Sequence, residues 1–162
     1  MNWSKCSAYY LFAIYLAAVY AAVGLPDVTY YRFYPHFNII PFQYMFSDME
    51  TTVLNVLLFF PLGLLLPVIW KDFRKACRTI LFGICMTSAI ELLQIFTFRA
   101  TDINDLMTNT LGTVLGYCCW KLLKLKFFKD HVSDNNKEFT AVCISAFGVM
   151  YFFYPFANLL IT

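Results

Sequence analysis

Long apolar runs separated by short polar segments dominate the pattern of residues along the chain. A run of about 20 apolar residues is what a helix needs to cross the hydrocarbon core of a bilayer. Five such runs occur, at residues 7–25, 52–70, 79–98, 106–123 and 139–161. The alternation typical of barrel strands is missing, and helices satisfy their own backbone hydrogen bonds in lipid. The pattern therefore predicts an all-α integral membrane bundle of about five transmembrane helices.

The connection between the first two predicted spans, residues 26–51, is long and rich in tyrosine and phenylalanine. Aromatic rings favour the membrane interface, where an apolar body meets a polar edge. Pro35 and Pro41 interrupt any long helix in this segment. We expect it to lie on the outer leaflet or to dip into it. A plain aromatic belt with no further role is the alternative.

Composition agrees with a membrane location. Of the 162 residues, 60% are hydrophobic and only 14% are charged. Soluble domains are closer to one quarter charged and about half apolar. The length accommodates one compact helical domain, residues 1–162, without an appended soluble domain.

The basic residues predict an orientation. The N-terminus, the 70–79 connection and the stretch from Lys121, at the end of the fourth span, to Lys137 hold ten of the twelve lysines and arginines. Only Arg32 and Arg99 lie on the opposite side. The positive-inside rule then places the N-terminus in the cytoplasm and the C-terminus outside. The net charge of +2 reflects this topology, and we expect no nucleic-acid partner.

The first span also has features of a secretory signal. Lys5 precedes an apolar run that ends near the small residues Ala21 and Ala22. The run is longer than the usual signal core, however, and no clear A-x-A cleavage site follows it. The other four spans keep their orientation in either case.

Polar side chains interrupt the third predicted span. Thr87, Glu91 and Gln94 are spaced by four and three residues, so they share one helix face. A carboxylate within a bilayer is costly unless it is paired, protonated or hydrated, and such residues are functional candidates.

The second and fourth spans carry similar stripes. Asn55, Phe59 and Gly63 share a face of the second span, where Pro61 is expected to kink the helix. The fourth span has its stripe at Asp105, Asn109, Gly112 and Gly116. Its GxxxG spacing favours close helix packing, which we expect to hold the Asn109 face against the third helix.

These polar groups have similar predicted depths. Asn55, Gln94 and Asn109 lie roughly one turn below the outer ends of their spans, and Glu91 lies about two turns down. We therefore predict an outer-leaflet pocket that binds a polar head group. The predicted ligand-binding residues are Asn55, Glu91, Gln94, Arg99, Asp102, Asp105 and Asn109.

The turn between the third and fourth spans has two interpretations. Arg99 pairing with a carboxylate would close the pocket, whereas an exposed pair would have little effect. Asp102 or Asn104 could instead cap the fourth helix, with Asp105 favourable in its first turn.

The sequence gives little support for a metal site or a redox site. The six cysteines lie in predicted spans or at their cytoplasmic ends, without CxxC spacing, and are expected to be packing residues. His36 is a lone histidine in the outer connection, where an interfacial polar role is the expectation. We expect neither a metal site nor a cofactor.

Four runs together resemble the VanZ-like family of bacterial membrane proteins, in the family's order and spacing from residue 37 to residue 124. They are "FNIIPF" (37–42), "NVLLFFPLG" (55–63), "SAIELLQ" (88–94) and "RATDINDLMTNTLGTVLG" (99–116). The resemblance implies a multi-pass protein of the bacterial cytoplasmic membrane that acts at the cell envelope, with teicoplanin resistance as the associated function. It assigns no proven role to the matching positions, which are Asn55, Pro61, Gly63, Glu91, Gln94, Arg99, Asp102, Asp105, Asn109 and Gly112.

Three classes of function follow. The leading hypothesis is a binding protein, in which Arg99 takes an anionic group and the pocket amides hydrogen-bond a lipid-linked envelope precursor, a membrane lipid or a lipoglycopeptide. An intramembrane enzyme is less favoured; Glu91, Asp102 and Asp105 would be its acid and base candidates. The third class is a structural subunit of a membrane complex, and the oligomeric state stays open.

Overall fold

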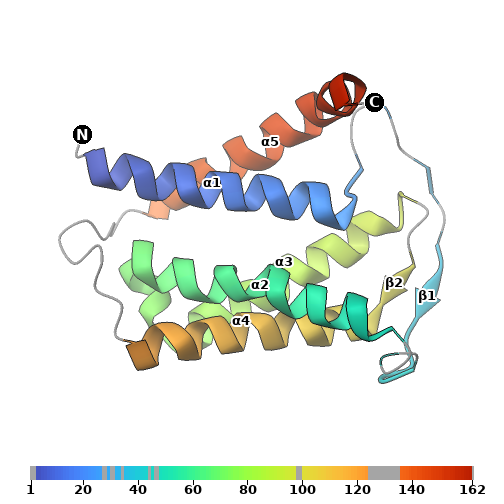
Figure 1. Cartoon of the computed structure of the whole chain (residues 1–162), viewed down its shortest axis with the longest axis horizontal. Helices are drawn as coiled ribbons and strands as arrows, with labels where there is room; N and C mark the ends of the chain where they lie inside the picture. Colours follow the sequence, from blue (N-terminus) through green and yellow to red (C-terminus); the bar gives the residue numbers. More distant parts are fainter. Residues whose placement is uncertain are drawn as a thin grey trace.

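Five helices of alternating direction make up the described part of this computed structural model (Figure 1). The structure describes residues 3–26, 29, 32–33, 35–43, 45, 48–97, 100–123 and 136–161. The helices are α1 (Trp3–Val23), α2 (Met49–Ile69), α3 (Ala76–Gln94), α4 (Ile103–Leu123) and α5 (Asn136–Ile161). The predicted all-α membrane bundle is confirmed, and the predicted order of helices is correct.

Four of the described helices are long and apolar enough to cross a membrane: α1, α2, α3 and α5. The helix α4 has the same length as α2, 21 residues, but it is more polar. Its buried residues include Asn104, Thr108, Asn109 and Thr113. The fourth predicted span therefore forms a helix, but it falls short of the hydropathy of the other four.

The helix ends differ from the predicted spans by a few residues. The helix α2 begins at Met49, where the side chain of Asp48 accepts a hydrogen bond from the backbone N–H of Thr51 at 3.2 Å. The helix α3 ends at Gln94, four residues before the predicted end. A short 3₁₀ helix, Lys71–Arg74, connects α2 to α3.

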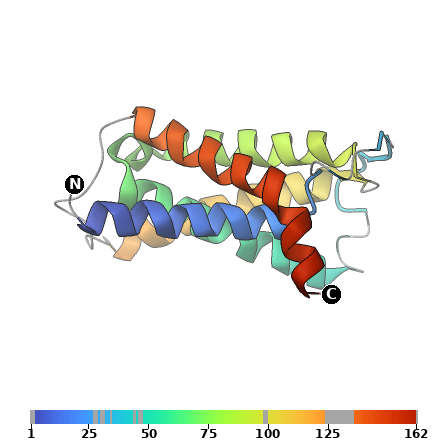
Figure 2. The ribbon, with the colours of Figure 1, turned by 90° about the horizontal axis from the view of Figure 1, so that it is seen from above.

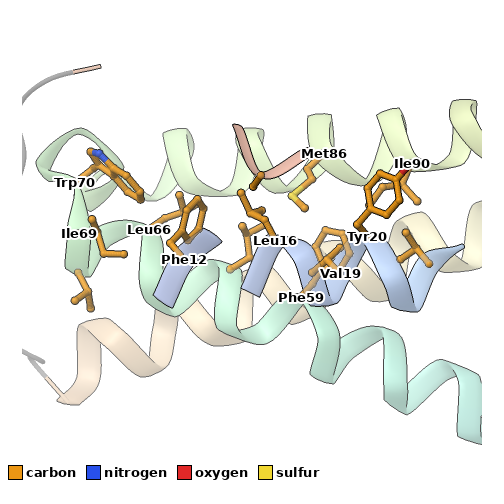
Figure 3. Close-up of a cluster of buried hydrophobic side chains, with 14 of the residues drawn as sticks. Phe12, Leu16, Val19, Tyr20, Phe59, Leu66, Ile69, Trp70, Met86 and Ile90 are labelled. Carbon is orange, nitrogen blue, oxygen red and sulfur yellow. The ribbon is translucent and has the colours of Figure 1, made fainter. Parts of the chain in front are cut away.

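An apolar core joins α1 to α2 and α3 (Figure 3). Phe12 and Leu16 of α1 are almost fully buried, as are Phe59 and Leu66 of α2. At one end of the core, the Trp70 ring stacks on Tyr9, with ring centroids 5.7 Å apart. Burying rings of this size gives α1 a large contact area with the rest of the bundle.

The helix α5 packs against α1 and runs obliquely across the bundle (Figure 2). Tyr20 of α1 contacts Phe147 and Tyr154 of α5, with ring centroids 6.2 and 5.9 Å apart. Near the other end of α1, the Tyr9 hydroxyl donates a hydrogen bond to the Glu138 carboxylate of α5. The helices α1 and α5 thus form a pair beside α2, α3 and α4.

Glycines let α2 and α4 touch at the backbone. A Cβ atom on Gly63 would lie 1.9 Å from the carbonyl oxygen of Thr113, and one on Gly116 would lie 2.0 Å from that of Phe60. Gly112 makes the same kind of contact with Val56. The close packing expected at Gly112 and Gly116 occurs against α2, while the Asn109 face of α4 lies against α3 as expected.

Contact between α3 and α4 depends on another glycine, Gly83. A Cβ atom there would lie 2.6 Å from the side-chain oxygen of Thr113. Sequence reasoning missed Gly83 because it belongs to no GxxxG pair. Pro61 lies inside α2, which continues as a helix to Ile69, and the expected kink at Pro61 stays a prediction.

A small parallel β-pair lies at the end of the bundle where α1 ends and α4 begins (Figure 1). Strand β1 (Phe37–Asn38) pairs with β2 (Thr101–Asp102), so that Asn38 is opposite Asp102. The backbone N–H of Thr101 donates to the carbonyl of His36 at 2.8 Å. The pattern predicted no strands, so this pair is an addition to the expected fold.

Candidate binding site

A cavity of about 600 Å³ lies between α1, α2, α3 and α4, at the same end of the bundle as the β-pair. Its wall combines polar side chains with leucines and alanines. The residues that line it are Ala22, Val23, Thr51, Leu54, Asn55, Leu57, Leu58, Ile90, Glu91, Gln94, Ala100, Asp105 and Asn109.

Five of the seven residues predicted to bind a ligand line this cavity: Asn55, Glu91, Gln94, Asp105 and Asn109. Asp102 lies beside the cavity and is absent from its lining. Arg99 lies outside the described residues, so its expected pairing with a carboxylate stays a prediction. The spacing and depth of the polar stripes therefore located residues that come together in space.

Asn55 and Asp105 connect α2 to α4 at the cavity. The side-chain nitrogen of Asn55 donates to Oδ1 of Asp105 at 2.7 Å. Both side chains are half-buried. A hydrogen bond to a carboxylate is stronger than a neutral one, so this contact fixes the facing positions of the two helices.

Asn109 connects α4 to α3. Its side-chain nitrogen contacts the hydroxyl oxygen of Thr87 at 2.9 Å, and both residues are buried. Thr87 shares a helix face with Glu91 and Gln94, as its spacing predicted. Its position shows that the polar stripes of α3 and α4 face each other.

Gln94 connects α3 to the end of α1. Its side-chain nitrogen donates to the backbone carbonyl of Val23 at 2.8 Å. Only 5% of Gln94 is exposed, and its Oε1 atom has no hydrogen-bond partner among the residues that the structure describes. The same holds for Oδ1 of Asn109. Within the described ranges, two buried acceptors at this cavity thus lack a hydrogen-bond partner, which is uncommon in folded proteins.

Glu91 is almost fully buried, with 4% exposed, and holds the β-pair against α3. Its Oε2 atom accepts a hydrogen bond from the backbone N–H of Asp102 at 2.8 Å. Its backbone carbonyl accepts another from the hydroxyl of Thr101 at 3.0 Å. A carboxylate that accepts a backbone N–H inside the protein is better stabilised than one exposed to lipid.

Asp102 caps α4, as one of the two sequence interpretations expected. Its Oδ1 atom accepts from the backbone N–H of Asn104 at 2.8 Å, and its Oδ2 atom accepts from the side chain of Asn38 at 3.0 Å. Both carboxylate oxygens therefore organise the helix start and the β-pair. Of the three carboxylates considered for acid–base chemistry, only Glu91 and Asp105 line the cavity.

Asn104 is a structural residue that sequence reasoning named only as a possible cap. Its Oδ1 atom accepts from the backbone N–H of Phe42 at 2.7 Å, and its nitrogen donates to the carbonyl of Gln43 at 2.9 Å. These bonds hold the turn at Phe42, whose φ of 65° is unusual for a residue with a side chain. The "FNIIPF" run marks this turn in the sequence, but the run itself does not indicate which residue holds the turn.

The contribution of α1 was also missed. Ala22 and Val23 line the cavity, and the backbone carbonyl of Val23 accepts the hydrogen bond from Gln94. Every residue has a backbone carbonyl, so the sequence does not show which carbonyl accepts a side-chain hydrogen bond.

The described residues offer no group of three or more His, Cys, Asp or Glu side chains placed to hold a metal ion. The six cysteines are free thiols, and three of them, Cys77, Cys85 and Cys118, are exposed on the protein surface. The side chain of His36 is exposed as well.

Comparison with known proteins agrees with the resemblance in the sequence. The curated proteins include the Protein VanZ of Enterococcus faecium, which is 36% identical over 80 residues, or 49% of this chain and 48% of that protein. The match thus spans about half the length of that relative. No solved structure matches the chain. The VanZ/LLP1 family model matches residues 9–124, a region that includes every residue lining the cavity, and the chain belongs to this family.

Proposed function

We propose that this protein acts in the bacterial cytoplasmic membrane and that its cavity binds the head group of a lipid-linked envelope component or of a lipoglycopeptide antibiotic. By this binding it would contribute to resistance of the teicoplanin type. The family membership supports an envelope function, and a relative of the chain is the Protein VanZ.

One observation carries the proposal. Polar side chains from α2, α3 and α4 converge on a single cavity, although each is costly to place in a membrane helix. Structural needs account for the Asp102 cap, but the buried Gln94 and Asn109 oxygens find no partner within the part of the chain that the structure describes. Groups retained at such cost in a concave site are the usual sign of ligand binding.

The rest of the cavity wall suits a lipid-linked molecule. Leu54, Leu57 and Leu58 of α2 line it beside the polar groups, and the first two are exposed on the bundle surface. A polar head group would occupy the cavity while its apolar chain lies along α2 in the membrane. The positive-inside rule would place this end of the bundle in the outer leaflet, where envelope precursors and antibiotics are found.

A resistance assay tests the proposal. The protein is expressed in a sensitive bacterium, and the inhibitory concentration of a lipoglycopeptide is measured for Glu91→Gln and Asp105→Asn. Glu91→Gln retains an oxygen for the N–H of Asp102, so it removes charge with little change of shape. We expect each variant to lose most of the protection at normal membrane levels.

Thr110→Val serves as the matched control, because Thr110 follows Asn109 in α4 but does not line the cavity. Its hydroxyl donates only to the backbone of its own helix, at Leu106. The control should retain protection. Full protection by the double variant Glu91→Gln/Asp105→Asn would overturn the proposal.

A further inference from the structure

The three amide side chains in the cavity wall all use their nitrogens in the same way. Gln94 donates to the Val23 carbonyl, Asn55 donates to the Asp105 carboxylate, and the nitrogen of Asn109 faces the Thr87 hydroxyl. Each amide is therefore held by a protein acceptor on its donor side. One N–H of each amide is thus engaged, and in Gln94 and Asn109 the carbonyl oxygen is the buried atom without a partner among the described residues.

Gln94 is the strictest case, because its orientation is determined by chemistry. A backbone carbonyl can only accept, so the group that faces Val23 must be the amide nitrogen. Oε1 is then an acceptor at the cavity wall, buried and without a partner among the described residues. Because Gln94 lines the cavity, this oxygen is placed to accept from a molecule bound there.

Asn109 gives weaker support, since a threonine hydroxyl can either donate or accept. In the observed arrangement its Oδ1 atom is a second buried acceptor without a described partner. Gln94 and Asn109 belong to facing helices, α3 and α4, and both line the cavity. Two acceptors on facing walls suit one molecule with several donor groups.

We infer that the cavity recognises a head group rich in O–H or N–H donors, such as sugar hydroxyls or a primary ammonium, rather than a phosphate or carboxylate. This inference rests on the proposed function, because it names the class of head group that the same cavity binds. It differs from the expectation that the amides hydrogen-bond an anion, because an anion could use only the remaining N–H of each amide and would leave the two buried oxygens unpaired.

The surroundings would make such recognition selective. Ala22, Leu57, Leu58 and Ile90 form apolar parts of the wall. A site that offers acceptors in apolar surroundings discriminates strongly against an analogue without donors, because its buried acceptors then stay unpaired.

Lipid pairs in which methyl groups replace the donor hydrogens of the head group provide the probe. The full chain is placed in nanodiscs, and bound lipids are measured by competition and native mass spectrometry. One pair is a glucosyl diacylglycerol and its permethylated form; the other is phosphatidylethanolamine and phosphatidylcholine. We expect the donor-bearing member of at least one pair to bind roughly tenfold more tightly. The pair that shows the preference distinguishes a sugar from an ammonium.

Variants connect the preference to the two oxygens. Gln94→Leu and Asn109→Leu each remove an acceptor and should lower the preference roughly three- to tenfold. Asn109→Asp retains an acceptor and can accept from the Thr87 hydroxyl, so the preference should persist. Thr110→Val is the control and should behave as the native chain. Thermal unfolding of each variant identifies any loss caused by misfolding alone.

Ala22→Trp separates failure of the inference from failure of the proposed function. Ala22 lines the cavity and is exposed on α1, so a large ring there should block entry without disturbing the core. If Ala22→Trp abolishes lipid binding, but the native chain binds lipids with and without donors equally well, the inference alone is overturned. Binding that Ala22→Trp leaves unchanged would overturn both, and so would a high-resolution map with only water on the two oxygens and no lipid in the cavity.

Discussion

Asn55 and Asp105 form a hydrogen bond whose strength depends on its surroundings. The contact joins two helices at a cavity whose wall includes several apolar side chains. Deleting the amide therefore removes the bond and leaves the carboxylate less well solvated than it would be in water. Both groups are half-buried, so we expect a moderate effect.

The prediction is that Asn55→Ala lowers the free energy of unfolding by about 1 kcal/mol, and that Asp105→Ala lowers it by a similar amount. The double variant should lose less than the sum of the single losses, because both remove the same hydrogen bond. Thermal unfolding of the four proteins in one detergent measures the coupling. Strict additivity would show that the bond contributes nothing.

The residues of the cavity were predictable where polar residues repeat along one face of a helix. Glu91 and Gln94 share the spacing of one face, and Asn109 lies at a matching depth on the next helix. Asn104 and Val23 lacked such a signal. Asn104 acts on a turn that is distant in sequence, and Val23 acts through its backbone.

The helices α2 and α4 depend on glycine for their close contact. Gly63 lies against the backbone of Thr113, and backbone cannot move aside as a flexible side chain can. An added methyl group must therefore push the two helices apart. The shift would also move Asn55 and Asp105, which these helices carry.

We predict that Gly63→Ala destabilises the protein by about 1–3 kcal/mol and weakens ligand binding. Gly148→Ala is the matched control, because a Cβ atom at this position in α5 meets nothing within 4 Å. Alanine is the better helix former, so the control should be neutral or slightly stabilising. Thermal unfolding in detergent compares the two, and equal behaviour would contradict the packing role of Gly63.

The elements themselves were predictable to different degrees. Apolar runs of the right length identify α1, α2, α3 and α5, because burial in lipid requires them. The strands β1 and β2 have two residues each, too few to show any periodicity. Their pairing depends on two connections that meet only in the folded bundle.

For the whole molecule, the direction of the chain across the membrane determines where the cavity opens. The helices alternate in direction, so the 70–79 connection and the β-pair lie at opposite ends (Figure 1). Lys71, Arg74 and Lys75 are at the first end. The positive-inside rule predicts that this end is cytoplasmic and that the cavity end faces outward.

Single-cysteine labelling in intact cells tests this orientation. In a chain whose other cysteines are replaced by alanine, the exposed Cys77 at the start of α3 should resist a membrane-impermeant maleimide until the cells are lysed. In a fully cysteine-free chain, Ile39→Cys should react in intact cells, because Ile39 is 75% exposed beside β1 at the cavity end. The reverse pattern would place the cavity in the inner leaflet, where an envelope precursor could still reach it before export but an external antibiotic could not. Labelling would thus decide between the two ligand classes as well as the topology.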